Sequence, residues 1–403
     1  MTSHAESQLL NSIRRAADGH CASQCFHVEG LEVELRAVDP ASIRWVLKSM
    51  QPLSLTTARD TRAKYSVTYV YSDEIVQEAI ENLNDIDLVH IRRHGQVRYV
   101  RLSRPSASSV LYTDPDEGVL WVSDLANNSV YLIVSSRTKH PAMAFASLTR
   151  ELVTRYLAQE GWTLFHAGAV DTPSGALMVV GNGGAGKTSL LMAFLCAGAR
   201  FVANELLYVR QCDDGPRLLG FPMPIAVGLG TALQFPPLAE RIDSPGELEY
   251  PRNRLKLSRV VNTPQSEWKD LEDKLQVLPS ELSKLLGAPP PAPGGSICGV
   301  VVPMVGREPA LQAVEHLSTE AVSKILSNNH IGLTQDSRYR PWMELNFGPG
   351  PTQRHGPIIA SLSELSPVRF RFGLSLETFE QNRTYIDALR VAHEQESLTA
   401  FAQ

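Results

Sequence analysis

Apolar and polar residues alternate along the first part of the chain, in short runs separated by glycine, asparagine and aspartate. The runs are residues 31–38, 66–72, 88–103, 118–124 and 129–136. A period of two is typical of strands that have one face on a core, so these runs predict a largely antiparallel sheet. Short helices are expected at Asp39-Pro40 and over residues 74–84. The region carries no motif of chemical interest and is interpreted as a module for recognition, sensing or packing.

The spacing changes after residue 137. Apolar residues recur at helical intervals over 141–160, and Gly161 ends the pattern. Two strand-like runs follow, joined by the turn sequence Asp171-Thr172-Pro173-Ser174-Gly175, in which Asp171 is interpreted as a turn former. The second strand of this β-hairpin leads directly into a glycine-rich loop. A helix ended by Gly198 and one further strand, ARFVANELLYV from residue 199, complete a strand–loop–helix–strand unit that is typical of phosphate-binding proteins.

Proline and glycine mark two connectors, at 286–296 and 348–357. The strand ICGVVVP and a helix around 318–328 lie between them, and the strand VRFRFGLSL and an amphipathic helix follow. The predicted fold class is α/β, a P-loop kinase-like mixed sheet with helices, plus a β-rich (α+β) N-terminal module. The expected divisions are 1–137 for the N-terminal module, 138–347 for the P-loop domain and 348–403 for a C-terminal strand–helix extension.

Composition narrows the classes of function. The formal net charge of −5 argues against a general binder of nucleic acid or of anionic membranes, and no apolar run approaches the roughly 18 residues of a membrane-spanning helix. The N-terminal residues lack the apolar core of a signal peptide, and five dispersed cysteines do not resemble a secreted disulfide framework. A cytoplasmic protein is therefore expected.

A zinc site is one local alternative, formed by His20, Cys21, Cys25 and His27. The two cysteines are separated by three residues and no second pair of ligands follows nearby, whereas structural zinc sites take two ligand pairs with characteristic spacings. A reduced pair of cysteines near the N-terminus is the alternative interpretation.

The glycine-rich loop fits two phosphate-binding patterns. Gly181 to Gly186 reads G-x-G-x-x-G, the fingerprint of dinucleotide-binding folds, and Glu205 lies near the expected position of their ribose-binding acid. Gly181 to Thr188 reads G-x-x-x-x-G-K-T, the P-loop of nucleoside triphosphate enzymes. Lys187 and Thr188 favour the P-loop, because the phosphates need a cation and Mg²⁺ needs a hydroxyl. The antiparallel hairpin before the loop also differs from the parallel crossovers of dinucleotide-binding sheets.

In a P-loop, glycines let backbone N–H groups turn towards phosphate oxygens, and the following helix adds its positive end. The predicted nucleotide-binding residues are the loop and the start of its helix: Gly181, Asn182, Gly183, Gly184, Ala185, Gly186, Lys187, Thr188 and Ser189.

These features together resemble the HPr kinase/phosphorylase family, which is related to phosphoenolpyruvate carboxykinase through its P-loop. His166 precedes Gly181 by 15 residues, as a histidine does in that family. Asn204-Glu205 occupies the position of the family's Asp-Asp pair, which closes the strand after the P-loop helix. The likeness covers roughly residues 160–210 and is absent from the N-terminal region.

The resemblance implies a Mg²⁺-dependent kinase that moves the terminal phosphoryl group of ATP, or of GTP, to a Ser or Thr hydroxyl of a peptide or protein. It implies that Lys187 and the loop hold the phosphates, that Thr188 and Glu205 hold Mg²⁺, and that His166 lies against the reacting phosphate. Asn204 departs from the pattern, because an amide cannot accept the hydroxyl proton at neutral pH. Glu205 could serve as the base instead. Members of the family often form oligomers, although nothing in this chain independently demands one.

Two other functions stay open. A nucleotide-binding regulatory or accessory protein would use the same site without transferring phosphate, and a small-molecule kinase would act on a sugar or an amino acid. A kinase that acts on a protein and one that acts on a small molecule both need a cation that neutralises the charge of the transition state. The candidates for this cation are Arg252, Arg254, Lys256 and Lys274.

Overall fold

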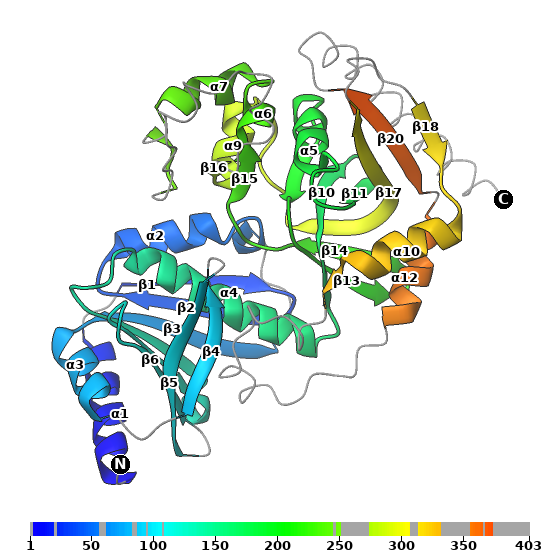
Figure 1. Cartoon of the computed structure of the whole chain (residues 1–403). Helices are drawn as coiled ribbons and strands as arrows, with labels where there is room; N and C mark the ends of the chain where they lie inside the picture. The colour runs from blue at the N-terminus through cyan, green and yellow to red at the C-terminus, as the bar shows by residue number, and fades with distance from the viewer. Residues whose placement is uncertain are drawn as a thin grey trace. The chain divides into compact units, whose positions relative to one another are not determined.

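The structure is a computed structural model. It describes residues 3–19, 22–55, 62–82, 87–93, 96–106, 109–244, 247–250, 274–306, 313–331, 355–365 and 367–373. These residues divide between two compact units (Figure 1). The first unit contains the described residues within Met1–Met50 and Ser54–Gly161, including the helix predicted over 141–160. The second includes Gln51–Leu53, residues 162–331 and the described residues that follow. Among the described residues, the chain passes from the first unit to the second between Gly161 and Trp162.

The first unit is built on an eight-stranded sheet of order β1-β2-β3-β8-β7-β6-β5-β4. Its strands are β1 (Ala22–Val28), β2 (Leu31–Ala37), β3 (Ala63–Tyr71), β4 (Asp87–Arg93), β5 (Gln96–Ser106), β6 (Ser109–Asp114), β7 (Val119–Asp124) and β8 (Ser129–Val134). The β2–β3 and β3–β8 pairs are parallel and the other neighbours are antiparallel. The largely antiparallel sheet is confirmed, while β1 and β6 are strands that the sequence pattern did not predict.

Helices cover both faces of this sheet (Figure 1). They are α1 (Ser3–Ala17), α2 (Pro40–Ser49), α3 (Asp73–Asn82) and α4 (Pro141–Gln159). Ile13 of α1 and Val76 of α3 pack with Val122 and Ile133 on one face. On the other face Tyr69 stacks on Phe145 of α4, with ring centroids 5.7 Å apart. Asp39 caps α2 by accepting hydrogen bonds from the backbone N–H groups of Ala41 and Ser42, which explains why the helix begins at Pro40.

The second unit contains a mixed sheet of order β12-β10-β11-β17-β14-β13-β9-β19, with β20 paired to β17 and β18 paired to β20. Its strands are β9 (Thr163–Phe165), β10 (Ala167–Thr172), β11 (Gly175–Val180), β12 (Arg200–Ala203), β13 (Leu207–Cys212), β14 (Gly215–Gly220), β17 (Gly294–Gly306), β18 (Ala313–His316), β19 (His330–Ile331) and β20 (Val368–Gly373). β17 joins the two halves of the sheet, because its first residues pair with β14 and its later residues pair in parallel with β11 and β20.

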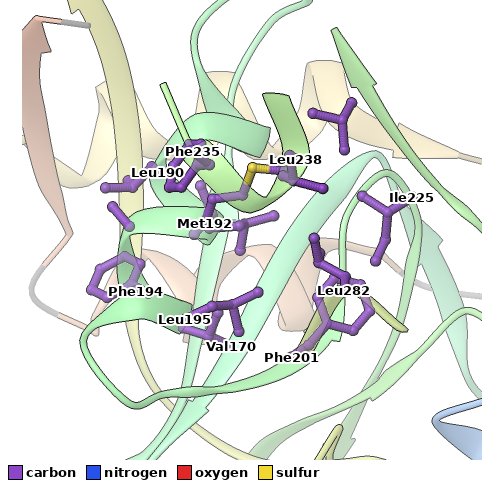
Figure 2. Packing of buried hydrophobic residues seen from close by; sticks show 14 of the residues in the cluster. Val170, Leu190, Met192, Phe194, Leu195, Phe201, Ile225, Phe235, Leu238 and Leu282 are labelled. Atoms are coloured by element: carbon purple, nitrogen blue, oxygen red, sulfur yellow. The ribbon is translucent and has the colours of Figure 1, made fainter. Parts of the chain in front are cut away.

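Two apolar cores lie on opposite faces of this sheet. Two further strands, β15 (Ile225–Gly228) and β16 (Lys274–Val277), form a separate two-stranded ribbon. The described helices of this unit are α5 (Lys187–Cys196), α6 (Leu229–Ala232), α7 (Pro236–Asp243), α9 (Pro279–Leu285), α10 (Thr319–Asn329) and α12 (His355–Ser363). Val170 of β10 packs with Met192 of α5, Ile225 and Leu282 on one face (Figure 2). Met178 of β11 packs with α10 and α12 on the other face. The mixed α/β class is therefore confirmed.

Several local predictions can be compared with these elements. The hairpin is confirmed, because Thr172 pairs with Gly175 across a two-residue turn, but Asp171 is not a turn former: it lies in β10 and pairs with Ala176. The helix that ends at Gly198 is also confirmed, and this glycine has a φ of +95°. The single strand predicted over ARFVANELLYV is wrong: β12 pairs with β10 whereas β13 pairs with β9 and β14, and the chain leaves the sheet between them.

Two predictions concern the last part of the chain. Residues 355–357 of the second predicted connector begin α12, and residues 348–354 lie outside the described residues, as does the final predicted helix. β20 pairs in parallel with β17 and antiparallel with β18, so it is an inner strand of the sheet.

Candidate functional site

The predicted site residues lie at one edge of the second unit's sheet. β10 is antiparallel to both of its neighbours, β11 and β12, so β11 and β12 run in the same direction. The carboxyl ends of β11 and β12 and the start of β10 therefore share an edge. This topology places the loop after β11, Asn204-Glu205 after β12, and His166 before β10 at that edge. Carboxyl ends of strands are where open α/β sheets bind ligands.

The strands at this edge approach each other closely. A Cβ atom on Gly168 would lie 3.0 Å from the backbone carbonyl oxygens of Ala203 and Asn204. His166 is half-buried, and its backbone N–H donates to the carbonyl of Asn329 over 2.7 Å. A glycine inside a strand pattern often marks a close approach of two backbones, so HAGAV carried a signal that the sequence analysis did not use.

Two glycines of the glycine-rich loop have a backbone conformation that favours glycine. Gly184 and Gly186 adopt left-handed conformations, with φ of +78° and +96°. The Ala185 carbonyl accepts a hydrogen bond from the N–H of Val305 in β17 over 3.1 Å. Gly186 lies directly against the side chains of Val305 and Phe372, at the ends of β17 and β20. The loop therefore packs against β17 and β20, two strands that are distant from it in sequence.

Lys187 begins α5 and turns back onto the loop. Its side chain is buried, and Nζ donates to the carbonyl oxygens of Gly181 over 2.6 Å and of Asn182 over 3.2 Å. Burial lowers the pKa of the Lys187 ammonium, the carboxylate of Glu205 opposes this shift, and the positive charge of Lys274 adds to it. These interactions place Glu205 and Lys274 within electrostatic reach of the loop lysine.

The first turn of α5 also carries two hydroxyl groups. Thr188 is partly exposed, and Ser189 is buried. The Ser189 hydroxyl lies 2.9 Å from the Thr231 hydroxyl of α6, a contact that ties α6 to the helix of the loop. Ser189, which the sequence predicts to bind nucleotide, therefore also has a structural role: it connects α5 to α6, which the sequence did not indicate.

Asn204 is the unsatisfied residue of the site. It is 4% exposed, and neither Oδ1 nor Nδ2 has a hydrogen-bond partner among the described residues. A buried polar group without a partner costs about 1–3 kcal/mol. Buried polar groups of folded proteins are usually hydrogen-bonded, so the two atoms of the Asn204 carboxamide are available to a ligand, an ion or a water molecule.

Neither a scan against protein-family models nor a search of the curated proteins found a match for this chain. The resemblance to HPr kinase/phosphorylase therefore rests on the loop and the residues at its edge alone.

A metal site built only from His, Cys, Asp and Glu is absent from the described part of the chain, where no three such side chains gather. His20 and Cys21 of the zinc alternative lie outside the described residues, and His27 contacts Glu32 with Nε2 and Oε2 3.1 Å apart. The four described cysteines are free thiols. None of the described helices is long and apolar enough to span a membrane.

Magnesium makes smaller demands on a protein, because it usually binds through one or two carboxylates together with substrate phosphates and water. The edge offers hard oxygen donors of this kind in the Thr188 hydroxyl, the Glu205 carboxylate and the unpartnered Oδ1 of Asn204. The residues present therefore fit a magnesium ion that arrives with a nucleotide.

Replacing Asn204 with leucine is expected to raise the free energy of unfolding of the ligand-free protein by about 1–2 kcal/mol. The change removes two buried polar atoms that have no partner and keeps a similar side-chain volume. Urea denaturation measures the effect. The matched control is Asn329→Leu, because Asn329 is also buried but donates Nδ2 to the carbonyl of Ile325 over 2.9 Å, so its loss should destabilise the protein. Destabilisation by both substitutions would show that Asn204 is satisfied in the folded protein.

Proposed function

We propose that this protein is a phosphotransferase that moves the terminal phosphoryl group of ATP or GTP to a hydroxyl group, the acceptor being a Ser or Thr of a peptide or protein. The observation that carries the proposal is the shared edge, where a P-loop sequence in a left-handed glycine turn meets Glu205 and an unpartnered Asn204. A dinucleotide site has no need of the lysine and threonine that begin α5.

Binding follows from the loop and its helix. The backbone N–H groups of the loop and the start of α5 would accept the phosphates, since a helix N-terminus favours negative charge. The Lys187 ammonium, now held by the loop's own carbonyls, would contact the β- and γ-phosphates. Thr188 and Glu205 would hold Mg²⁺, which supplies charge neutralisation on the phosphates.

Transfer requires a new bond between the acceptor oxygen and the γ-phosphorus, while the bond from that phosphorus to the β–γ bridging oxygen breaks. The nucleoside diphosphate leaves with the bonding electron pair. The hydroxyl proton would pass to Glu205 in the alternative in which Glu205 is the base and Mg²⁺ is left to Thr188 and the phosphates. Asn204 cannot take this proton, but its carboxamide can donate to a phosphate oxygen or accept from the hydroxyl. His166 precedes Ala167, which pairs with Val180 at the end of β11, and would lie against the reacting phosphate, as the family resemblance implies.

Asn204 also favours a second candidate, a nucleotide-binding regulatory or accessory protein that performs no transfer. The two candidates agree on the site and differ only in the product. A small-molecule kinase shares the chemistry of the first candidate and differs in the acceptor.

The experiment that tests the proposal has two stages. Thermal unfolding with ATP, GTP or NADH, each with and without Mg²⁺, should show stabilisation by a triphosphate, because a ligand at 100 times its Kd adds about 2.7 kcal/mol. Incubation with γ-labelled ATP and a degenerate Ser/Thr peptide library, or with a set of sugars and amino acids, then detects transfer. Stabilisation by NADH alone would overturn the P-loop interpretation, and triphosphate binding with no labelled product would support the regulatory protein.

A further inference from the structure

The β15–β16 ribbon brings a distant lysine to the phosphate loop. Leu275 and Val277 of β16 and Val227 of β15 are fully buried, in the same core as the α5 residues Leu190 and Met192. The ribbon is therefore anchored on the face of the sheet that carries the helix of the P-loop. Leu238 and Leu282, from the neighbouring helices α7 and α9, belong to the same core (Figure 2).

The register of the ribbon fixes the position of Lys274. Lys274 pairs with Gly228, the last residue of β15, immediately before α6 begins. α6 is hydrogen-bonded to α5 through the hydroxyls of Thr231 and Ser189, which are 2.9 Å apart. Ser189 lies two positions after Lys187. Lys274 thus lies at the end of the ribbon that is tied to the first turn of the P-loop helix, and its side chain is exposed.

Lysine at this position has an electrostatic consequence in the ligand-free protein. Its charge interacts with that of Lys187, and two like charges near one another are unfavourable. A polyanion placed between them would replace this repulsion by attraction to both. Lys274 makes no ion pair with a described residue, whereas Arg369 and Arg371 pair with Glu315 and Arg210 lies over the Trp162 ring.

We propose that Lys274 is the second cation of the phosphate site, where its ammonium binds the terminal phosphate of the nucleoside triphosphate opposite Lys187. The assignment rests on the proposed function and adds a residue from outside the P-loop segment. Charge on the transferred group spreads over its peripheral oxygens, so a cation held at this position stabilises transfer as well as binding. Arg252, Arg254 and Lys256, the other candidates for this role, lie outside the described residues.

The experiment compares nucleotide affinities of the full chain by calorimetric titration with Mg·ATP, Mg·ADP and AMP. Lys274→Met is expected to weaken ATP binding about ten-fold, a loss of one charge-assisted contact, and to leave AMP binding within about two-fold of wild type. Lys274→Arg should restore most of the ATP affinity, which a purely structural role for the side chain would not predict. The matched control is Lys284→Met, an exposed lysine of α9 in the same region, which should bind all three nucleotides as wild type does.

Two results separate the failure of this assignment from the failure of the proposed function. Wild-type ATP affinity in Lys274→Met, together with lost affinity in Lys187→Met, would refute the role of Lys274 and leave the triphosphate site intact. An absence of triphosphate binding by the wild-type protein would refute both. An equal loss of ATP and AMP affinity in Lys274→Met would also overturn the assignment, because the terminal phosphate would not be its target.

Discussion

Replacing Lys187 with methionine is expected to lower the rate of the proposed phosphoryl transfer roughly 10³-fold, the largest catalytic effect expected for a single substitution in this site. Lys187 is the buried cation of the loop, and its Nζ already lies at the loop's carbonyl oxygens. Methionine keeps much of the apolar stem and removes only the charge and its hydrogen bonds. Single-turnover transfer from γ-labelled ATP, at saturating acceptor, measures the loss.

The folded state should survive this substitution. Burial disfavours the ammonium, as the lowered pKa of Lys187 indicates, so the change in the free energy of unfolding is expected to stay within about 1 kcal/mol. Lys324→Met, an exposed lysine of α10 on the opposite face of the sheet, is the control and should transfer at the wild-type rate. Unchanged turnover in Lys187→Met would mean that the reaction does not occur at the P-loop.

Replacing Gly186 with alanine is expected to destabilise the protein by about 2–4 kcal/mol and to abolish nucleotide binding. The added Cβ would overlap the side chain of Val305 and lie 3.1 Å from Phe372, at a residue whose φ of +96° already disfavours any side chain. For a unit of this size the melting temperature should fall by roughly 5–15 °C. Thermal unfolding followed by circular dichroism, with and without Mg·ATP, measures both effects.

The loop provides its own control for this prediction. A Cβ atom on Gly183 would meet nothing within 4 Å, so Gly183→Ala should change the free energy of unfolding by no more than about 0.5 kcal/mol. If the two substitutions were equally mild, the loop would not be packed against β17 and β20 as described.

The local parts of the site could be predicted from the sequence because short-range signals determine them. The Pro173-Ser174-Gly175 run specifies the turn of the hairpin, and Gly186-Lys187 marks the start of α5. These features depend on backbone conformation within a few residues, where turn and helix rules apply directly.

Long-range pairing determines the parts that the sequence did not reveal. ARFVANELLYV is mostly apolar and resembles one strand, but its halves join different partners, and this separation places Asn204-Glu205 in the connection after β12. Lys274 showed no distinctive spacing among several candidate cations, and its pairing with Gly228 across the ribbon is what singles it out. The support that Val305 and Phe372 give to Gly186 likewise depends on strands distant in sequence.

Because β17 joins the two halves of the sheet, the order in which the strands are synthesised affects folding. The Cys298 thiol in β17 donates to the carbonyl of Ala176 in β11 across 122 positions of the chain. At translation rates of about 5–20 residues per second, the hairpin and the P-loop emerge from the ribosome roughly 6–24 s before the strand that pairs with them. During that interval β11 has an unpaired edge of mostly apolar residues, the kind of surface on which nascent chains associate wrongly. The proposed nucleotide site is therefore expected to form late in synthesis, and a nascent chain arrested before β17 should require a chaperone and should fail to bind triphosphate.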